Sequence, residues 1–200
     1  MVDEDDADRI TVHPVTPERW PDLVAVFGTR GANASWCWCQ QWTPRGRTTG
    51  DNRSALQGEL EAELPPGLLA YRDDEPVGWA RVGPRAGYPL VTENRALSRL
   101  TADGADAWWT ACFAVRTGHR GTGVGVALLR GAIDFAREHG ARTLEGYPVD
   151  VGALTAKKVG TSGLYTGTRS MFVAAGFEEV ARTVPTRPIM RRLLTEPLTG

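Results

Sequence analysis

The chain has 200 residues, and its 23 lysine and arginine residues nearly balance its 24 aspartate and glutamate residues, giving a net charge of −1. This balance gives no support for nonspecific nucleic-acid binding, and no apolar run approaches the ~20 residues needed to cross a bilayer. We therefore expect neither a nucleic-acid nor a membrane partner. The length predicts one domain with a substantial core.

The N-terminal run MVDEDDAD is acidic, unlike the basic start of a secretory signal. We expect residues 1–9 to be a disordered, solvated tail and residues 10–200 to form a single domain. The cytoplasm is the expected compartment.

Local patterns predict the elements of the first half of the chain. We expect a strand at 10–15 and a helix at 17–27, with Thr16 as its N-cap and Gly28 at its end. An irregular loop then precedes a helix at 51–64, for which Asp51 is the expected cap. The remaining predictions are a hairpin of strands at 68–72 and 77–82, a loop at 84–89 and a short helix at 94–100.

The most informative segment, residues 108–130, has the sequence WWTACFAVRTGHRGTGVGVALLR. Its apolar start predicts a buried strand, and its end predicts an amphipathic helix that stops near Gly140. Between them, Gly121, Gly123 and Gly125 permit positive φ angles and a close approach of the backbone to a ligand. Because a helix N-terminus has free N–H groups and the positive end of its dipole, this turn predicts a phosphate or pyrophosphate site.

The spacing of these glycines limits the choice of cofactor. A Walker-type loop needs Gly-Lys-Ser/Thr, whereas Gly125 is followed by Val126 and Ala127. A dinucleotide fingerprint needs a third glycine or alanine where Val126 stands, although Glu145 lies at about the distance expected of a ribose-binding acid. The triphosphate loop is therefore excluded, and an NAD-dependent oxidoreductase remains a less favoured alternative.

Residues 120–125, RGTGVG, instead resemble the Arg/Gln-x-x-Gly-x-Gly/Ala signature of the GNAT superfamily of N-acetyltransferases, through Arg120, Gly123 and Gly125. In that family the amides of this loop hold the pyrophosphate of coenzyme A. The resemblance covers residues 108–184 well and the first half of the chain only in outline.

A second similarity lies downstream, where residues 172–177, FVAAGF, resemble the family's second motif, a short helix that ends at Gly-Phe. Gly176 suits a left-handed C-cap. The family often has Asn, Ala and Tyr where this chain has Tyr165, Thr168 and Phe172. These departures leave open a catalytically weak module that binds acyl-CoA.

The resemblance implies an α/β (α+β) fold with a mixed central β-sheet flanked by helices, in which the fourth and fifth strands splay apart. In the second half of the chain we expect strands at 143–149, 178–184 and 188–194, the last two forming an antiparallel pair. Together these elements predict a single GNAT-like domain.

The resemblance also implies a function, the transfer of an acetyl group from acetyl-CoA directly to an amine of a small molecule or protein. Acetyl-CoA would be the co-substrate, and no metal is expected. By position, the strand edge at 113–115 would offer amides to the pantetheine and the thioester carbonyl. The expected cofactor-binding residues are Phe113, Ala114, Val115, Arg120, Gly121, Thr122, Gly123, Val124, Gly125 and Phe172.

The sequence indicates the general acid and the general base less directly than the cofactor-binding residues. The family's usual acid is a tyrosine in the second motif, and Phe172 at that position cannot donate a proton. Tyr165 is the nearest phenol in the sequence and Tyr147 the next, while Glu145 and Asp150 are the candidate bases. An ion-paired or solvated role for each carboxylate, a water relay, or no dedicated base is also compatible with this chemistry. We predict Glu145 and Tyr165 as catalytic residues.

The acceptor pocket is expected near the two loops of the first half. Trp36, Trp38 and Trp42 could line a pocket for an apolar or cationic group, or form a lid that packs on the sheet. Arg85 is a candidate to bind a carboxylate or phosphate of the acceptor. The expected assembly is a monomer or homodimer.

The three cysteines are Cys37, Cys39 and Cys112. Cys37-Trp-Cys39 is too close for the usual zinc spacing, and no second Cys pair or His-x-x-x-His accompanies it. Two interpretations remain, redox pairing or reduced thiols that pack as small apolar side chains.

Overall fold

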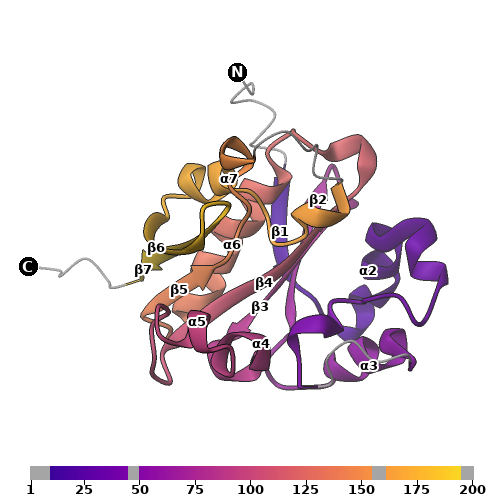
Figure 1. Cartoon of the computed structure of the whole chain (residues 1–200). Helices are drawn as coiled ribbons and strands as arrows, with labels where there is room; N and C mark the ends of the chain where they lie inside the picture. Colours follow the sequence, from indigo (N-terminus) through magenta and orange to yellow (C-terminus); the bar gives the residue numbers. More distant parts are fainter. Residues whose placement is uncertain (1–9, 45–49, 155–160, 195–200) are drawn as a thin grey trace, which may run out of the picture.

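The computed structural model describes residues 10–44, 50–154 and 161–194, so the predicted tail at 1–9 lies outside the described residues. A seven-stranded sheet forms its centre, in the order β1-β2-β3-β4-β5-β7-β6 (Figure 1). The strands are β1 (Ile10–Pro14), β2 (Gly67–Arg72), β3 (Glu75–Pro84), β4 (Ala107–Val115), β5 (Thr143–Gly146), β6 (Glu178–Val184) and β7 (Arg187–Leu193).

Only one pair of neighbouring strands in this sheet is parallel. β1 to β4 form an antiparallel meander, and β5, β7 and β6 are also antiparallel to one another. The parallel pair β4–β5 runs only from Ala107 opposite Thr143 to Thr110 opposite Gly146, after which β4 continues along β3 to Val115. The predicted splay of the fourth and fifth strands is therefore confirmed.

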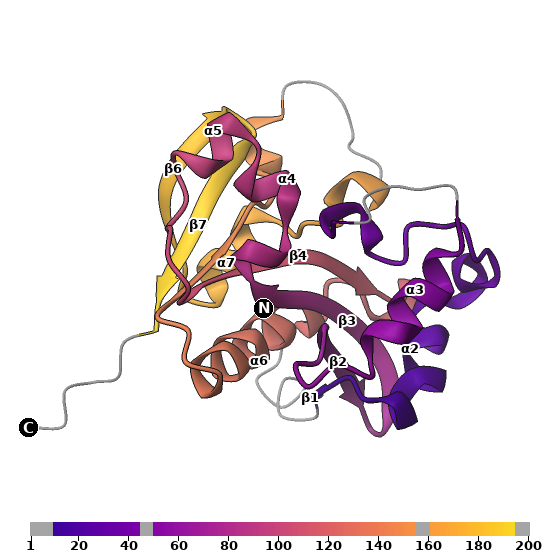
Figure 2. The same ribbon diagram turned by 90° about the horizontal axis from the view of Figure 1, so that it is seen from below.

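Helices cover both faces of the sheet (Figures 1 and 2). α6 and α7 pack on one face, and α2, α3 and the loop that carries Trp36 and Trp38 pack on the other. The helices are α2 (Trp20–Phe27), α3 (Asn52–Glu59), α4 (Pro89–Thr92), α5 (Arg95–Ser98), α6 (Val124–Glu138) and α7 (Arg169–Ala174). Short 3₁₀ turns are η1 (Pro17–Arg19), η2 (Gly28–Ala32), η3 (Gln40–Trp42), η4 (Arg85–Gly87), η5 (Thr117–His119), η6 (Val151–Ala153) and η7 (Thr161–Leu164).

The two-sided burial follows from the alternation of side chains along the strands. Leu68 packs into the cluster under α6, whereas its neighbour Leu69 packs into the cluster under α2. α6 is the central helix, because its apolar stripe, which includes Leu128, Ala132 and Ile133, is buried against the sheet. None of the helices in the described parts of the chain is long and apolar enough to cross a membrane.

Most predicted elements are present, and the two that fall furthest short of the expected end are the second helix and the strand after α6. The helix predicted at 51–64 ends at Glu59; Gly58 lowers helix propensity and Pro65 disfavours a helical Leu64. The Asp51 cap is confirmed, since its carboxylate accepts the Ser54 amide at 2.9 Å. The strand predicted at 143–149 ends at Gly146, because Pro148 cannot donate to a strand ladder.

Candidate functional site

A cleft of about 1250 Å³ opens at the splay of the sheet. Its walls are the last turn of α2, the loop that follows, the end of β4, the start of α6 and the segment from Leu164 to α7. The site therefore draws on both faces of the sheet and on segments far apart in the chain.

The glycine-rich turn forms one end of this cleft. Gly121 and Gly123 adopt φ angles of +76° and +87°, and α6 begins at Val124. The amide of Ala127 makes the first intrahelical bond, to the carbonyl of Gly123 at 3.0 Å. The amides just before it have no intrahelical acceptor and face the turn, so the sequence prediction of an anion-binding helix N-terminus matches the backbone geometry.

The charge around the turn also suits an anion. The described side chains that line the cleft include Arg30, Arg116 and Arg120, and none of them is Asp or Glu. Arg120 is exposed, and its Nε donates to the carbonyl of Val115 at 3.2 Å, which leaves its terminal nitrogens available to a ligand. A pyrophosphate would meet favourable charge here.

The free edge of β4 forms the floor of the cleft. Because the amide of Arg116 donates to Val77 of β3, alternation directs the amide of Ala114 to β3 and those of Phe113 and Val115 to the open edge. The amide of Phe113 already donates to the carbonyl of Tyr165 at 2.6 Å. Of the three amides predicted to be available, that of Val115 is thus the one directed at the cleft.

Tyr165 extends into the same cleft from the segment before α7. Its hydroxyl oxygen accepts a hydrogen bond from Nε2 of Gln41 at 3.1 Å, so the phenolic proton points elsewhere. Burial raises the pKa of Tyr165, which keeps this hydroxyl protonated. Tyr165 therefore presents a protonated phenol at the cleft.

A family model described as the acetyltransferase (GNAT) family matches residues 32–154, more than half of the chain and including the glycine-rich turn and β4. The chain belongs to the GNAT acetyltransferase family. This membership replaces the dinucleotide-dependent alternative and makes the protein an acyltransferase of a family that uses acetyl-CoA.

Solved GNAT structures resemble the whole chain in fold. The GNAT domain of S. lividans PAT has a TM-score of 0.55 at 18% identity, covering 91% of this chain and 89% of that chain. The structure of yncA from Salmonella typhimurium, which contains acetyl-CoA, has a TM-score of 0.53 at 16% identity and covers 96% and 97% of the two chains.

A third relative, the ribosomal-protein-alanine N-acetyltransferase of Brucella melitensis, has a TM-score of 0.51 at 20% identity and covers 92% and 99%. No curated protein sequence matches this chain significantly.

The structure brings ten of the predicted site residues of this GNAT chain to the cleft. They are Trp36, Phe113, Ala114, Val115, Arg120, Gly121, Gly123, Val124, Gly125 and Tyr165. Thr122 belongs to the same turn but does not line the cleft; its hydroxyl donates to the carbonyl of His119 at 2.8 Å.

Glu145, predicted as a catalytic base, does not lie at the cleft. It is fully buried, and its carboxylate accepts the amide of Ala102 at 3.0 Å and the guanidinium of Arg191 at 2.6 Å. Burial raises the pKa of Glu145, and the bonds from Arg191 and Ala102 oppose that change. These bonds link β7 and the segment at Ala102 to β5, and the position of Glu145 outside the cleft argues against the predicted role as a base.

Glu145→Gln tests this structural role. The amide can still accept one bond, but the Arg191 partner loses its counter-charge, so we expect the free energy of unfolding to fall by about 1–3 kcal/mol. We expect kcat per folded molecule to stay unchanged. Urea unfolding measures the first quantity and turnover of the folded fraction the second; a large loss of kcat with unchanged stability would return Glu145 to the chemistry.

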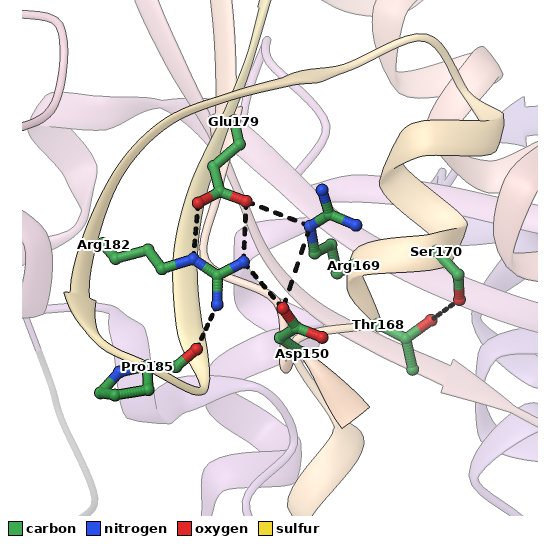
Figure 3. Close-up of polar contacts among 7 residues, drawn as sticks. All are labelled: Asp150, Thr168, Arg169, Ser170, Glu179, Arg182 and Pro185. Carbon is green, nitrogen blue, oxygen red and sulfur yellow. Dashed lines mark hydrogen bonds and ion pairs between the residues drawn. The ribbon is translucent and has the colours of Figure 1, made fainter. Parts of the chain in front are cut away.

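Asp150, the other candidate base, lies in a surface ion-pair cluster (Figure 3). Its carboxylate accepts Arg182 at 2.7 Å, and Arg182 also pairs with Glu179, which Arg169 of α7 contacts at 3.1 Å. The hydrogen bond from Arg182 lowers the pKa of Asp150. A carboxylate stabilised in its charged form by two arginines is a weak base, and the cluster links α7 to β6.

Tyr147, the second candidate acid, does not line the cleft either. Its hydroxyl bonds to that of Thr183 on β6, and Arg187 lies 5.4 Å from its ring centre.

The other predicted residues outside the cleft are mainly core residues. Phe172 is fully buried between Phe113 and Phe177, with ring centres 6.2 and 5.0 Å away. Trp38 and Trp42 are also buried, in the clusters beneath the loop, which confirms packing on the sheet for these two. Burial of these large apolar side chains in the core stabilises the fold more than a position in a solvent-facing pocket would.

Arg85 likewise lies away from the cleft, and its Nε donates a hydrogen bond to the hydroxyl of Thr101 at 3.0 Å.

Sequence reasoning missed Gln41 as a site residue and did not connect Cys39 with Cys112, although all three line the cleft. Gln41 follows the cysteine pair by two residues, but no local pattern indicates a bond to a tyrosine 124 positions away. The tryptophan-rich composition of the loop was the one available signal that it belonged to the site.

Proposed function

We propose that this GNAT protein transfers the acetyl group of acetyl-CoA to an amine bound in the cleft, with Tyr165 as the proton donor. The observation that carries the proposal is the meeting of three features in one cleft: the glycine-rich helix N-terminus, the free edge of β4 and a protonated phenol.

The residues present fit coenzyme A. The turn at Gly121 and Gly123 has room for a ligand, since a Cβ added at either glycine meets nothing within 4 Å. The amides at the start of α6 and the side chain of Arg120 would hold the pyrophosphate. The amide of Val115 faces the cleft from β4, as a donor for the pantetheine arm or the thioester oxygen.

When bound, acetyl-CoA supplies the activated thioester. The chain then has two tasks, to orient an amine toward that group and to provide a proton for the departing sulfur. The phenol of Tyr165 suits the second task, because Gln41 donates to its oxygen and leaves its proton free. With Glu145 and Asp150 outside the cleft, water is the proposed acceptor of the amine proton.

The charge of the cleft limits which class of amine can be the acceptor. Arginines at its rim and the absence of Asp or Glu among its described lining residues disfavour a polycation. Trp36 offers an aromatic surface, against which Arg30 lies at 6.0 Å. We propose an amine that carries an apolar or acidic group, on a small molecule or at a protein terminus.

Ligand-dependent thermal stability is the first test of this function. Acetyl-CoA at ~100 times its dissociation constant should stabilise the fold by roughly 2.7 kcal/mol, whereas NAD should not stabilise it. Thiol release is then measured with three amine classes: amino acids, a peptide with a free N-terminus, and spermidine as the polycationic control.

Turnover with the first two classes and not with spermidine is the expected result. Stabilisation by acetyl-CoA without thiol release from any amine would favour the module that binds acyl-CoA without turnover. No stabilisation by acetyl-CoA would overturn the proposal itself.

A further inference from the structure

All three cysteines of the chain lie in the wall of the cleft. Cys37 and Cys39 belong to the loop before η3, and Cys112 is on β4. The Sγ atoms of Cys39 and Cys112 are 3.0 Å apart, although 73 positions separate the two residues. The fold therefore places two thiols in contact in the wall of the cleft, a juxtaposition that packing of small apolar residues alone does not require.

The two contacting thiols differ in their surroundings. The sulfur of Cys39 accepts the indole N–H of Trp79 at 3.2 Å and lies within hydrogen-bond distance of the Cys112 sulfur. These bonds and the nearby charge of Arg81 lower the pKa of Cys39 against the effect of burial. The pKa of Cys112 is raised, chiefly by its bond to Cys39. Of the two contacting thiols, Cys39 therefore loses its proton more readily than Cys112.

We propose that Cys39 and Cys112 form a reversible disulfide when a hydroperoxide enters the cleft. A disulfide requires an S–S distance of about 2.05 Å, so the two sulfur atoms need to approach by only about 1 Å. Both residues are almost fully buried but line the cleft, which favours an oxidant as small as hydrogen peroxide.

The reaction is balanced. The Cys39 thiolate attacks one oxygen of the hydroperoxide, an S–O bond forms as the O–O bond breaks, and the departing oxygen takes a proton to give an alcohol or water. The Cys112 sulfur then attacks the sulfur of the Cys39 sulfenic acid, and the hydroxide leaves with the Cys112 proton as water. The two thiols lose two electrons in total, and the two peroxide oxygens gain them.

The disulfide would also affect the position of Tyr165, which we propose as the acid. This consequence rests on the proposed function. Gln41, two positions after Cys39, holds the hydroxyl of Tyr165, and Phe113, directly after Cys112, holds its carbonyl. A disulfide would join covalently the two segments that position Tyr165.

The test uses the full chain, reduced with dithiothreitol and then treated with hydrogen peroxide. Remaining thiols are alkylated before digestion with chymotrypsin, which cleaves after Trp38 and so separates Cys37 from Cys39. We expect the number of free thiols to fall from three to one, and residues 39–42 to be linked to residues 110–113. Dithiothreitol should restore all three thiols.

Cys37→Ser is the matched control, because it removes a cleft cysteine and leaves the contacting pair; its linked peptide should be unchanged. Linkage through Cys37, or oxidation of Cys39 to the sulfinic acid without any link, would overturn the inference. The linked peptide itself is sought in the wild-type protein, so only the control depends on the folding of a variant.

A parallel sample with acetyl-CoA separates the two proposals. Slower formation of the disulfide with cofactor present supports both, since the ligand would block the cleft. An unchanged rate contradicts the cofactor placement in the cleft and leaves the dithiol inference intact.

Discussion

Gly123→Glu is expected to abolish the stabilisation of this protein by acetyl-CoA. Gly123 has a φ of +87° directly before α6, and a Cβ there meets no atom within 4 Å. A side chain therefore fits, but it carries backbone strain and places a negative charge where the pyrophosphate is expected. In wild type, ligand at ~100 times its dissociation constant should raise the melting temperature by about 5–10 °C.

Gly140→Glu is the matched control for this variant. Gly140 follows the other end of α6 with a φ of +79° and equally open surroundings, but it does not line the cleft. Both variants should be less stable than wild type without ligand, and only Gly123→Glu should lose the shift. An undiminished shift in Gly123→Glu would place the cofactor elsewhere.

Tyr165→Phe is expected to lower kcat by about 10²–10⁴-fold, the range for loss of a general acid. The variant keeps the ring and the backbone carbonyl that accepts the Phe113 amide, so binding of acetyl-CoA should be unchanged. Leaving the amide of Gln41 without its acceptor should cost only about 1 kcal/mol of stability. Steady-state thiol release and a binding titration measure the two quantities separately.

The pH profile gives an independent readout of this role. Burial raises the pKa of Tyr165, so its proton should be lost, and activity with it, only above the usual tyrosine value of about 10. The Phe variant should lack this basic limb.

Tyr147→Phe, which removes a hydroxyl that bonds to Thr183 outside the cleft, should keep full kcat and the wild-type profile. Equal kcat in Tyr165→Phe and wild type would show that the proton comes from another donor.

The parts of the site that were predictable from the sequence are those encoded locally. Gly121 and Gly123, followed by an amphipathic stretch, indicate a turn into a helix wherever they occur, because the positive φ angles and the free amides depend only on neighbouring residues. The same holds for the Asp51 cap and for the end of β4. The turn and the end of β4 form the end of the cleft where we propose that the cofactor binds.

The remaining assignments depended on long-range contacts. Strand alternation alone allows the side chain of Glu145 to lie on either face of the sheet. Its ion pair with Arg191, which lies 46 positions away in the sequence, determines its position. Similarly, the spacing of three tryptophans does not indicate which of them the sheet covers; Trp38 and Trp42 are buried, and Trp36 is left at the cleft. The contact between Cys39 and Cys112 had no local signature at all.

The short parallel pairing of β4 with β5 has a mechanical consequence. Four residue pairs join the meander of β1 to β4 to the ribbon of β5, β7 and β6, and beyond them the two halves diverge around the cleft. On one face the core under α6 spans both halves, so a ligand in the cleft would add contacts between them at the end where the strands do not pair. The relative position of the two halves at that end would then depend on whether the cleft is occupied.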